Sequence, residues 1–325
     1  MRRQFLFSLA AVAVTAVVAV APAAAQIGEQ PIKIVFPFAA GGVGDAFARL
    51  LAENLREGLK GQPVVVENVT GAGGRAGTRN VVTAAPDGKT LLFTPIAPVA
   101  VHNHVYKDLG YDPLTDLAPV SLVAEFEFGI AVGAAMPAKT LKELVAWAKA
   151  NPGKASYGSP GAGALPHFFG VLFGKAVGVD LVHIAYKGSA PAILDLVGGQ
   201  IPIVVTTTSD LLAQHEAGKI RILATSDSKR SPLVPDVPTF KESGYDIVGT
   251  SWYAMFAPAK TPANVRENYA KILATTVQRP EIKERLLKMG LYAAGTTPDE
   301  LGKVQKRDSA LWAPAVSASG FKADQ

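Results

Sequence analysis

The chain has 325 residues, a formal net charge of +5 and no cysteine. The missing cysteines exclude disulfides, thiolate metal sites and a cysteine nucleophile. The charges are interspersed, with no long run of one sign, so the sequence indicates neither a nucleic-acid partner nor a membrane-surface role.

The N-terminus has the three parts of a secretory signal peptide. Met1-Arg2-Arg3 is positive, the stretch from Phe5 to Ala21 is almost wholly apolar, and Ala23 and Ala25 stand where a signal peptidase reads small residues. A membrane anchor is the alternative, but the apolar run is short for a bilayer span. We therefore predict a signal peptide over residues 1–25 and export of the mature chain.

Residues 36–45 join a strand to a helix through a glycine-rich turn. A β-branched stretch, 32–35, precedes the turn, and apolar residues at helical spacing follow it from Phe47 to Leu59. Gly41 and Gly42 let the backbone turn sharply, and the first amides of a helix have no intrahelical partner. The stretch is typical of an anion site, with a plain strand-to-helix turn as the alternative.

Further strand and helix signals alternate along the first half of the chain. Strands are predicted over 64–68 and 91–94, with turns at 71–77 and 86–88. Repeated β-α-β units favour a largely parallel sheet covered by helices on both faces, with ligands beyond the carboxyl ends of the strands. The glycines of 71–77 miss the dinucleotide-binding spacing, and His102-Asn103-His104 lacks a carboxylate, so neither a nucleotide nor a metal is expected.

A second strand, glycine turn and helix start follow at residues 156–167. A long strand-like stretch at 118–132 and a helix with a capping box at Thr140 precede it. Ser159 lacks the spacing of a hydrolase nucleophile and is read as a hydroxyl donor or a turn residue.

The remaining chain supplies more candidate loops. A strand with a helix start spans 182–192, a buried strand spans 201–205 with hydroxyl residues 206–209 behind it, and further strands are predicted at 220–224 and 249–258. Thr261-Pro262 and Thr297-Pro298 are typical of helix starts.

Taken in order behind a signal peptide, these stretches resemble the substrate-binding proteins of tripartite tricarboxylate transporters, the Bordetella uptake gene product family. The resemblance covers nearly all of the mature chain. It rests on Pro37 with Gly41-Gly42 and Asp45, residues 64–68 with 71–74, residues 85–88, 117–123, Tyr157-Gly158-Ser159 with Gly161, Gly163 and His167, and residues 186–192, 198–200, 235–239 and 250–252.

The resemblance implies an α/β periplasmic-binding-protein fold of type II, with two α/β lobes joined by two hinge-crossing strands near residues 120–130 and 247–257. We expect lobe 1 to comprise residues 26–126 plus 248–325 and lobe 2 to comprise residues 127–247. The implied function is non-catalytic: a monomer in the periplasm captures a small organic carboxylate and delivers it to a membrane permease. No cofactor or metal is expected.

The resemblance places the ligand carboxylate between the two glycine-rich loops, held partly through ordered waters. The expected ligand-binding residues are Phe38, Ala39, Ala40, Gly41, Gly42, Asp45, Ile96, Ser159, Gly161, Ala162, Gly163, His167, Tyr186, Lys187, Thr206 and Thr207.

Two positions depart from the family pattern. Ala40 replaces a proline, which loosens the first turn, and Thr206-Thr207 replace an acidic or amide residue, which disfavours aspartate or glutamate as ligand. Asp45 is interpreted more simply as a helix N-cap. The small-residue, apolar pocket suits a short dicarboxylate or an aromatic carboxylate. A receptor that feeds a sensor kinase is an alternative, and an exported hydrolase is a weaker one.

Overall fold

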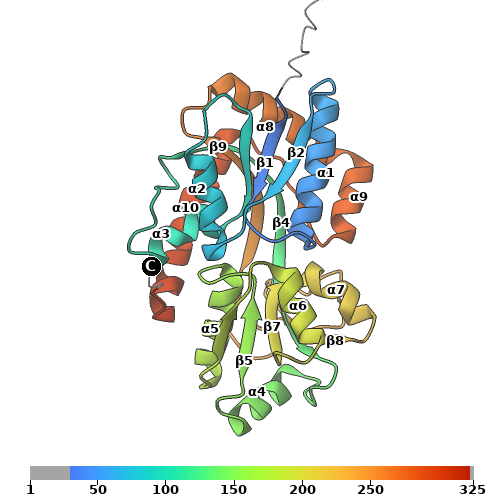
Figure 1. Cartoon of the computed structure of the whole chain (residues 1–325). Coiled ribbons are helices and arrows are strands. Elements are labelled where there is room, and N and C mark those ends of the chain that lie inside the picture. Colours follow the sequence, from blue (N-terminus) through green and yellow to red (C-terminus); the bar gives the residue numbers. More distant parts are fainter. Residues whose placement is uncertain (1–29, 323–325) are drawn as a thin grey trace, which may run out of the picture.

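A computed structural model describes residues 30–322, so the predicted signal peptide lies outside the described residues. The chain forms two α/β lobes, which lie one above the other in Figure 1. The first lobe holds β1 (Ile32–Phe36), α1 (Val43–Gly58), β2 (Val64–Asn68), η1 (Ala72–Gly74), α2 (Arg75–Val82), β3 (Thr90–Pro95), η2 (Ala97–Val101), α3 (His102–Val105), α8 (Ala263–Gln278), α9 (Pro280–Lys288) and β10 (Tyr292–Ala293).

The second lobe is built from the middle of the chain. It contains α4 (Leu141–Ala150), β5 (Ser156–Ser159), α5 (Leu165–Val177), β6 (Val182–Ala185), α6 (Ser189–Val197), β7 (Ile203–Thr207), α7 (Thr208–Glu216) and β8 (Ile220–Thr225). Within residues 30–322, no helix combines the length and the apolar character that a bilayer crossing requires.

The strands follow one path through both lobes, in the order β2-β1-β3-β9-β4-β7-β5-β6, and β8 and β10 also pair with β4 (Leu117–Gly133). β1 is parallel to β2 and β3, and β5 is parallel to β6 and β7. The loop after β1 meets the loop after β6 directly, because the amide of Ala39 donates to the carbonyl of Lys187 at 2.8 Å. The carboxyl ends of the parallel strands in the two lobes therefore face each other, and open α/β sheets bind their ligands beyond these ends.

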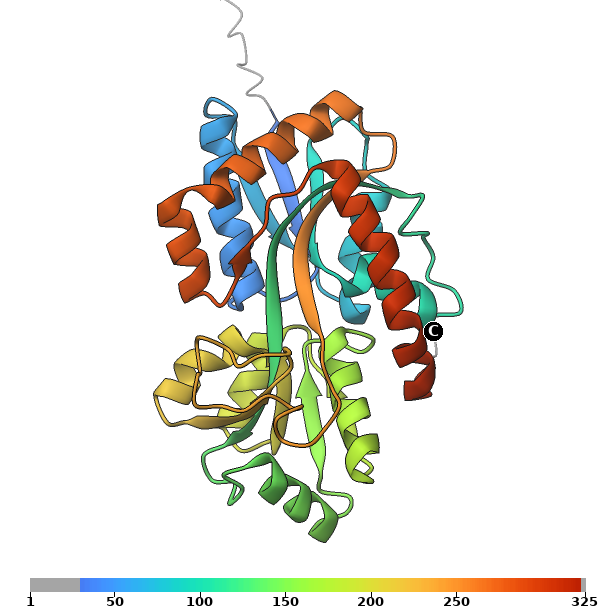
Figure 2. The ribbon, with the colours of Figure 1, turned by 180° about the vertical axis from the view of Figure 1, so that it is seen from behind.

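Two long antiparallel strands connect the lobes. β4 pairs with β9 (Thr250–Pro258) from Leu117 to Glu127, and from Phe128 onward it pairs with β7 and β8 of the second lobe. Both strands run down the middle of the molecule in Figure 2. The sequence predicted these two crossings, and the fold confirms the two-lobed type II architecture.

The C-terminal helix α10 (Pro298–Ser319) makes a third link between the lobes. It packs on η2 of the first lobe and on β4, and it also contacts α5 of the second lobe (Figure 2). The rings of Trp312 and Phe169 meet edge-on at 5.8 Å, and Phe321 meets His167 at 4.3 Å. Any hinge motion therefore has to rearrange the contact between α10 and α5.

Of the three helix starts predicted at Thr140, Thr261 and Thr297, two agree with the structure and one is shifted by a residue. Thr140 and Thr297 each form a complete capping box with the glutamate three residues later. At the third start, Pro262 rather than Thr261 is the N-cap of α8.

A buried acid lies at the point where β4 passes from one lobe to the other. Glu127 is 2% exposed, and neither of its carboxylate oxygens has a hydrogen-bond partner among the described residues. Burial raises the pKa of Glu127 to about 7, and the charge of Asp227 acts in the same direction. The ordinary pKa of this carboxyl, 4.5, holds in the unfolded chain.

We expect the Glu127→Gln protein to be more stable than the wild type at pH 8 and equally stable at pH 4. Between pH 4.5 and 7 the folded wild type binds more protons than the unfolded chain, so its stability falls as the pH rises through this window. The shift corresponds to about 3 kcal/mol at high pH. Denaturant unfolding of both proteins between pH 4 and 8 measures this difference in stability. Glu125→Gln is the control, because Glu125 is an exposed acid on the same strand. A difference that does not depend on pH would contradict the assignment.

Candidate functional site

A cavity lies between the lobes, at the carboxyl ends of the parallel strands. Its wall includes the loop after β1, the exit of β3 and, from the second lobe, residues at the starts of α5, α6 and α7. The cavity is small, with a volume of about 50 Å³ in this arrangement of the lobes.

The cavity is surrounded by helix N-termini rather than by basic side chains. Residues at the first turns of α1, α5, α6 and α7 all line it, among them Gly44, Leu165, Ser189 and Asp210. Within residues 30–322, its lining contains no lysine, arginine or histidine. Because the first amides of each helix lack intrahelical partners and the helix dipole favours negative charge there, the cavity is an anion-binding environment without a dedicated cation.

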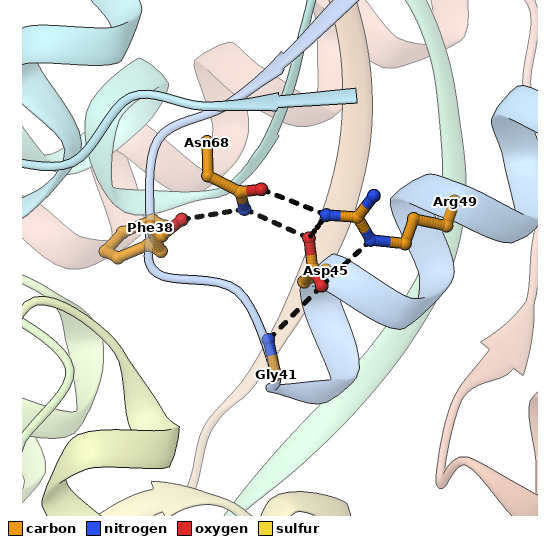
Figure 3. Close-up of polar contacts among 5 residues, drawn as sticks. All are labelled: Phe38, Gly41, Asp45, Arg49 and Asn68. Atoms are coloured by element: carbon orange, nitrogen blue, oxygen red, sulfur yellow. Dashed lines mark hydrogen bonds and ion pairs between the residues drawn. The ribbon is translucent and has the colours of Figure 1, made fainter. Parts of the chain in front are cut away.

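The glycine-rich turn after β1 is held in place by Asp45 (Figure 3). Its carboxylate accepts hydrogen bonds from the Arg49 guanidinium at 3.0 and 3.1 Å, from Asn68 at 3.0 Å and from the Gly41 amide at 3.2 Å. Asn68 also donates to the carbonyl of Phe38 at 3.0 Å. Burial alone would raise the pKa of Asp45, but these hydrogen bonds outweigh it and lower the pKa.

The N-cap interpretation of Asp45 is therefore wrong. The N-cap of α1 is Gly42, and Asp45 lies inside the first turn, where it folds back onto the Gly41 amide and ties the turn to β2. Its part in the site is to position the loop. The carboxylate itself does not line the cavity.

The lobes touch through backbone groups on both sides of the cavity. Besides the bond from Ala39 to Lys187, the Tyr106 hydroxyl donates to the carbonyl of Ala162 at 3.3 Å. The backbones of Gly73 and Gly161 pass so closely that a Cβ on Gly161 would lie 2.9 Å from the Cα of Gly73. The structure is thus a closed arrangement of the lobes.

A further contact between the lobes was not predicted from the sequence. The carboxylate Oδ1 of Asp210, on α7, accepts a hydrogen bond from the amide of Val43 at 2.7 Å. Val43 is the first residue of α1, so the acid occupies the helix start that the sequence assigned to the ligand. Burial raises the pKa of Asp210, while the Val43 amide and nearby hydroxyls oppose that rise.

Aromatic rings form much of the cavity wall. Phe36 and Phe38 come from β1 and its loop, Phe126 and Phe128 from β4, and Tyr253 from β9. Phe126 stacks on Tyr253 with ring centroids 4.5 Å apart and meets Phe128 edge-on at 5.4 Å. Of these rings the sequence predicted only Phe38. The alternation of Phe126 and Phe128 on one strand face was the signal available for two more.

Five of the predicted binding residues line the cavity: Phe38, Ala39, Gly42, Ile96 and Thr207. The others lie beside or behind it. Ala40, Gly41 and Lys187 are exposed at the rim, and Thr206 is buried behind the wall, with its hydroxyl 2.8 Å from that of Ser189. The Tyr186 hydroxyl donates to Asp195 at 2.6 Å, away from the lining.

The second glycine-rich loop is supported by two stacked histidines. His167 and His183 have ring centroids 3.9 Å apart, and the Gly163 amide donates to Nδ1 of His167 at 3.2 Å. Burial lowers the pKa of His167 to about 3 and that of His183 to about 4, so both rings are neutral at pH 7. Gly161 and Ala162 lie at the contact with the other lobe, and none of the loop's five predicted residues lines the cavity.

The Ser159 hydroxyl is 2.8 Å from Nε2 of His183, a serine–histidine pair of the type that the hydrolase alternative would need. The serine is fully buried, however, and lies outside the cavity lining. Its pairing is that of a core hydroxyl with a neutral histidine. A metal site is not supported either, because no three histidine or acidic side chains within residues 30–322 are grouped so that they could hold an ion.

Known proteins are similar to this chain in sequence and in structure over both lobes. The model of a family described as tripartite tricarboxylate transporter family receptors matches residues 47–321. BugT of Bordetella pertussis is 34% identical and aligns over 90% of each chain. The structure of the periplasmic binding protein BugD is 36% identical, with a TM-score of 0.87 over 91% of this chain and 99% of that one. A structure from R. palustris with adipate is 28% identical, with the same TM-score and the same shares of the two chains.

Proposed function

The chain belongs to the receptor family of tripartite tricarboxylate transporters, and on that premise we propose that it captures a small organic carboxylate between its lobes. Members of this family are solute-binding receptors and not enzymes. The observation that carries the proposal is the interlobe cavity, where four helix N-termini converge and no basic side chain lies among the described lining residues.

Such a cavity distinguishes carboxylates from neutral solutes by charge alone. Each helix start carries about half a positive charge, so an anion is favoured wherever several starts meet. The adipate in the R. palustris relative is a carboxylate of this kind. The aromatic walls add apolar surface for the body of the ligand.

We propose direct ligand contact for Phe38, Ala39, Gly42, Ile96 and Thr207, all of which line the cavity. Asp45 and His167 are proposed to hold the two glycine-rich loops in shape. The other exposed or glycine-rich loop residues are proposed to act at the closing surfaces between the lobes, a role supported by the contacts of Ala162 and Lys187. Ser159, Tyr186 and Thr206 are proposed to support the cavity wall from behind or beside it.

The lobe boundaries are proposed at residues 126–127 and 247–248. The register of β4 supports the first boundary, because its partner changes from β9 to β7 between Glu127 and Phe128. The second boundary is supported by the position of Thr250 at the start of β9.

Delivery of the ligand to a membrane permease, action as a monomer and residence in the periplasm complete the proposal. BugD and other relatives are periplasmic binding proteins, and the family serves tripartite transporters. The signal peptide predicted over residues 1–25 agrees with export.

A thermal-shift screen of residues 26–325 tests the proposal. We expect at least one carboxylate among mono-, di- and tricarboxylates, aromatic acids and amino acids to raise the melting temperature, whereas neutral sugars do not. A ligand at 100 times its dissociation constant stabilises the folded protein by about 2.7 kcal/mol. If only neutral solutes stabilise the protein, the proposed function fails.

A further inference from the structure

Asp210 is the acidic side chain of the ligand cavity. Among the cavity-lining residues that the structure describes, no other acid and no basic side chain occurs. A role for Asp210 in ligand choice rests on the proposed function, because it concerns which carboxylates the same cavity accepts.

The Asp210 carboxylate is held by donors from three helix starts. The Val43 amide at the start of α1 lies 2.7 Å from Oδ1, and the hydroxyls of Ser189, Thr206 and Thr207, near the starts of α6 and α7, act on the acid in the direction that lowers its pKa. Burial raises the pKa of Asp210, while these donors favour its ionised form and leave little of its hydrogen-bonding capacity for a ligand group. Asp210 is therefore an acid built into the cavity.

A charge balance then limits what else the cavity can hold. Four helix starts together present about two positive charges, since each contributes about half of one. In its ionised form Asp210 takes up about one of them, which leaves about one for the ligand. A ligand with two carboxylates would add a negative charge for which the cavity offers no counter-charge, and like charges in a low-dielectric site repel strongly.

Donors for a single ligand carboxylate remain beyond those that hold Asp210. Leu165, at the start of α5, lines the cavity. Ser251 also lines it, is 2% exposed, and has a hydroxyl with no hydrogen-bond partner within the described chain. A buried hydroxyl without a partner is costly unless a ligand satisfies it.

The rest of the cavity wall suits an apolar body. Phe126 and Phe128 lie on one face of β4, beside Tyr253, two residues along β9 from Ser251. Offset or edge-on contact with these rings favours a flat or slim apolar group.

We propose that Asp210 is a specificity-determining residue that restricts this receptor to monocarboxylates with an aromatic or other slim apolar body and excludes the corresponding dicarboxylates.

Matched pairs of acids test this restriction directly. Isothermal titration at pH 7.5 compares benzoate with terephthalate and hexanoate with adipate, in the wild type, in Asp210→Asn and in Glu216→Gln. Glu216 is an exposed acid at the far end of α7, so its variant makes the same charge change away from the cavity. We expect wild type and Glu216→Gln to bind each monocarboxylate at least tenfold more tightly than its partner. In Asp210→Asn that ratio is expected to fall at least tenfold.

The outcomes separate this inference from the proposed function. A wild type that prefers the dicarboxylates, or a ratio unchanged in Asp210→Asn, overturns the role of Asp210 while carboxylate capture stands. If none of the acids binds, the restriction to these monocarboxylates falls, and the thermal-shift screen decides carboxylate capture separately. A third pair, phenylalanine and 3-phenylpropionate, tests whether Asp210 instead pairs with an ammonium group. We expect phenylalanine to bind no more tightly, and a tighter phenylalanine complex would overturn the assignment.

Discussion

The Gly161→Val protein is expected to fold normally and to lose ligand binding. In the closed arrangement a Cβ at this position would lie 2.9 Å from the Cα of Gly73 in the other lobe, a distance that real Cβ atoms do not adopt. The obstacle is backbone on both sides, so no side-chain rotation relieves it. Because the two glycines meet only when the lobes close, valine should block closure without disturbing either lobe.

We expect the affinity for benzoate to fall at least about 100-fold, which corresponds to about 2.8 kcal/mol. The melting temperature of the unliganded protein should stay close to that of the wild type. Gly302→Ala is the control, since its Cβ would make only an ordinary 3.6 Å contact with Pro119 inside one lobe. Unchanged affinity in Gly161→Val would mean that binding does not need the closed arrangement.

A second substitution, Gly170→Ala, should destabilise the fold itself. Gly170 lies on α5 against the buried ring of Tyr157, and a Cβ there would overlap the Cε2 and Cζ atoms of that ring. The ring has no free space, and its hydroxyl donates to the carbonyl of His167 at 2.8 Å. Overpacking costs about 1–3 kcal/mol, and a broken buried hydrogen bond adds about 1–3 kcal/mol.

Denaturant unfolding should therefore show a loss of about 3 kcal/mol or more, although alanine is the better helix former. Gly302→Ala, also at a helical glycine but with only an ordinary 3.6 Å contact for its Cβ, should be neutral or stabilising. Adding Tyr157→Leu should recover part of the loss in Gly170→Ala, because the smaller side chain leaves room for the new Cβ. If Gly170→Ala is as stable as the wild type, α5 and β5 can move apart enough to accommodate the new Cβ without a loss of stability.

The sequence predicted those parts of the site that local chain geometry creates. A strand that ends in glycines before a helix carries its own signal, so the loops at 36–45 and 156–167 could be found in advance. The paired crossings near β4 and β9 could also be expected, because the family resemblance implies two crossings and the chain has two long strand-like stretches at 118–132 and 249–258. Those features depend on neighbours in the chain.

The rest of the site depends on residues that only the fold brings together. Asp210 meets Val43 across 167 positions in the chain, and nothing in the Thr-rich stretch before it indicates that its side chain reaches the other lobe. Ser159, His167 and Tyr186 have the residue types of a binding site, but they lie behind or beside the cavity lining. Which face of a loop points inward is decided by packing, not by composition.

The measurement that tests carboxylate capture between the lobes most directly is a crystal structure of the mature protein with benzoate. We predict that the carboxylate lies in the interlobe cavity, within hydrogen-bond distance of Ser251 or the start of α5, and that the ring lies between Phe126 and Phe38. Residues of both lobes should contact the ligand, and Asp210 should keep its bond to Val43. Benzoate bound outside the cavity, or held by one lobe alone, would contradict this mode of capture.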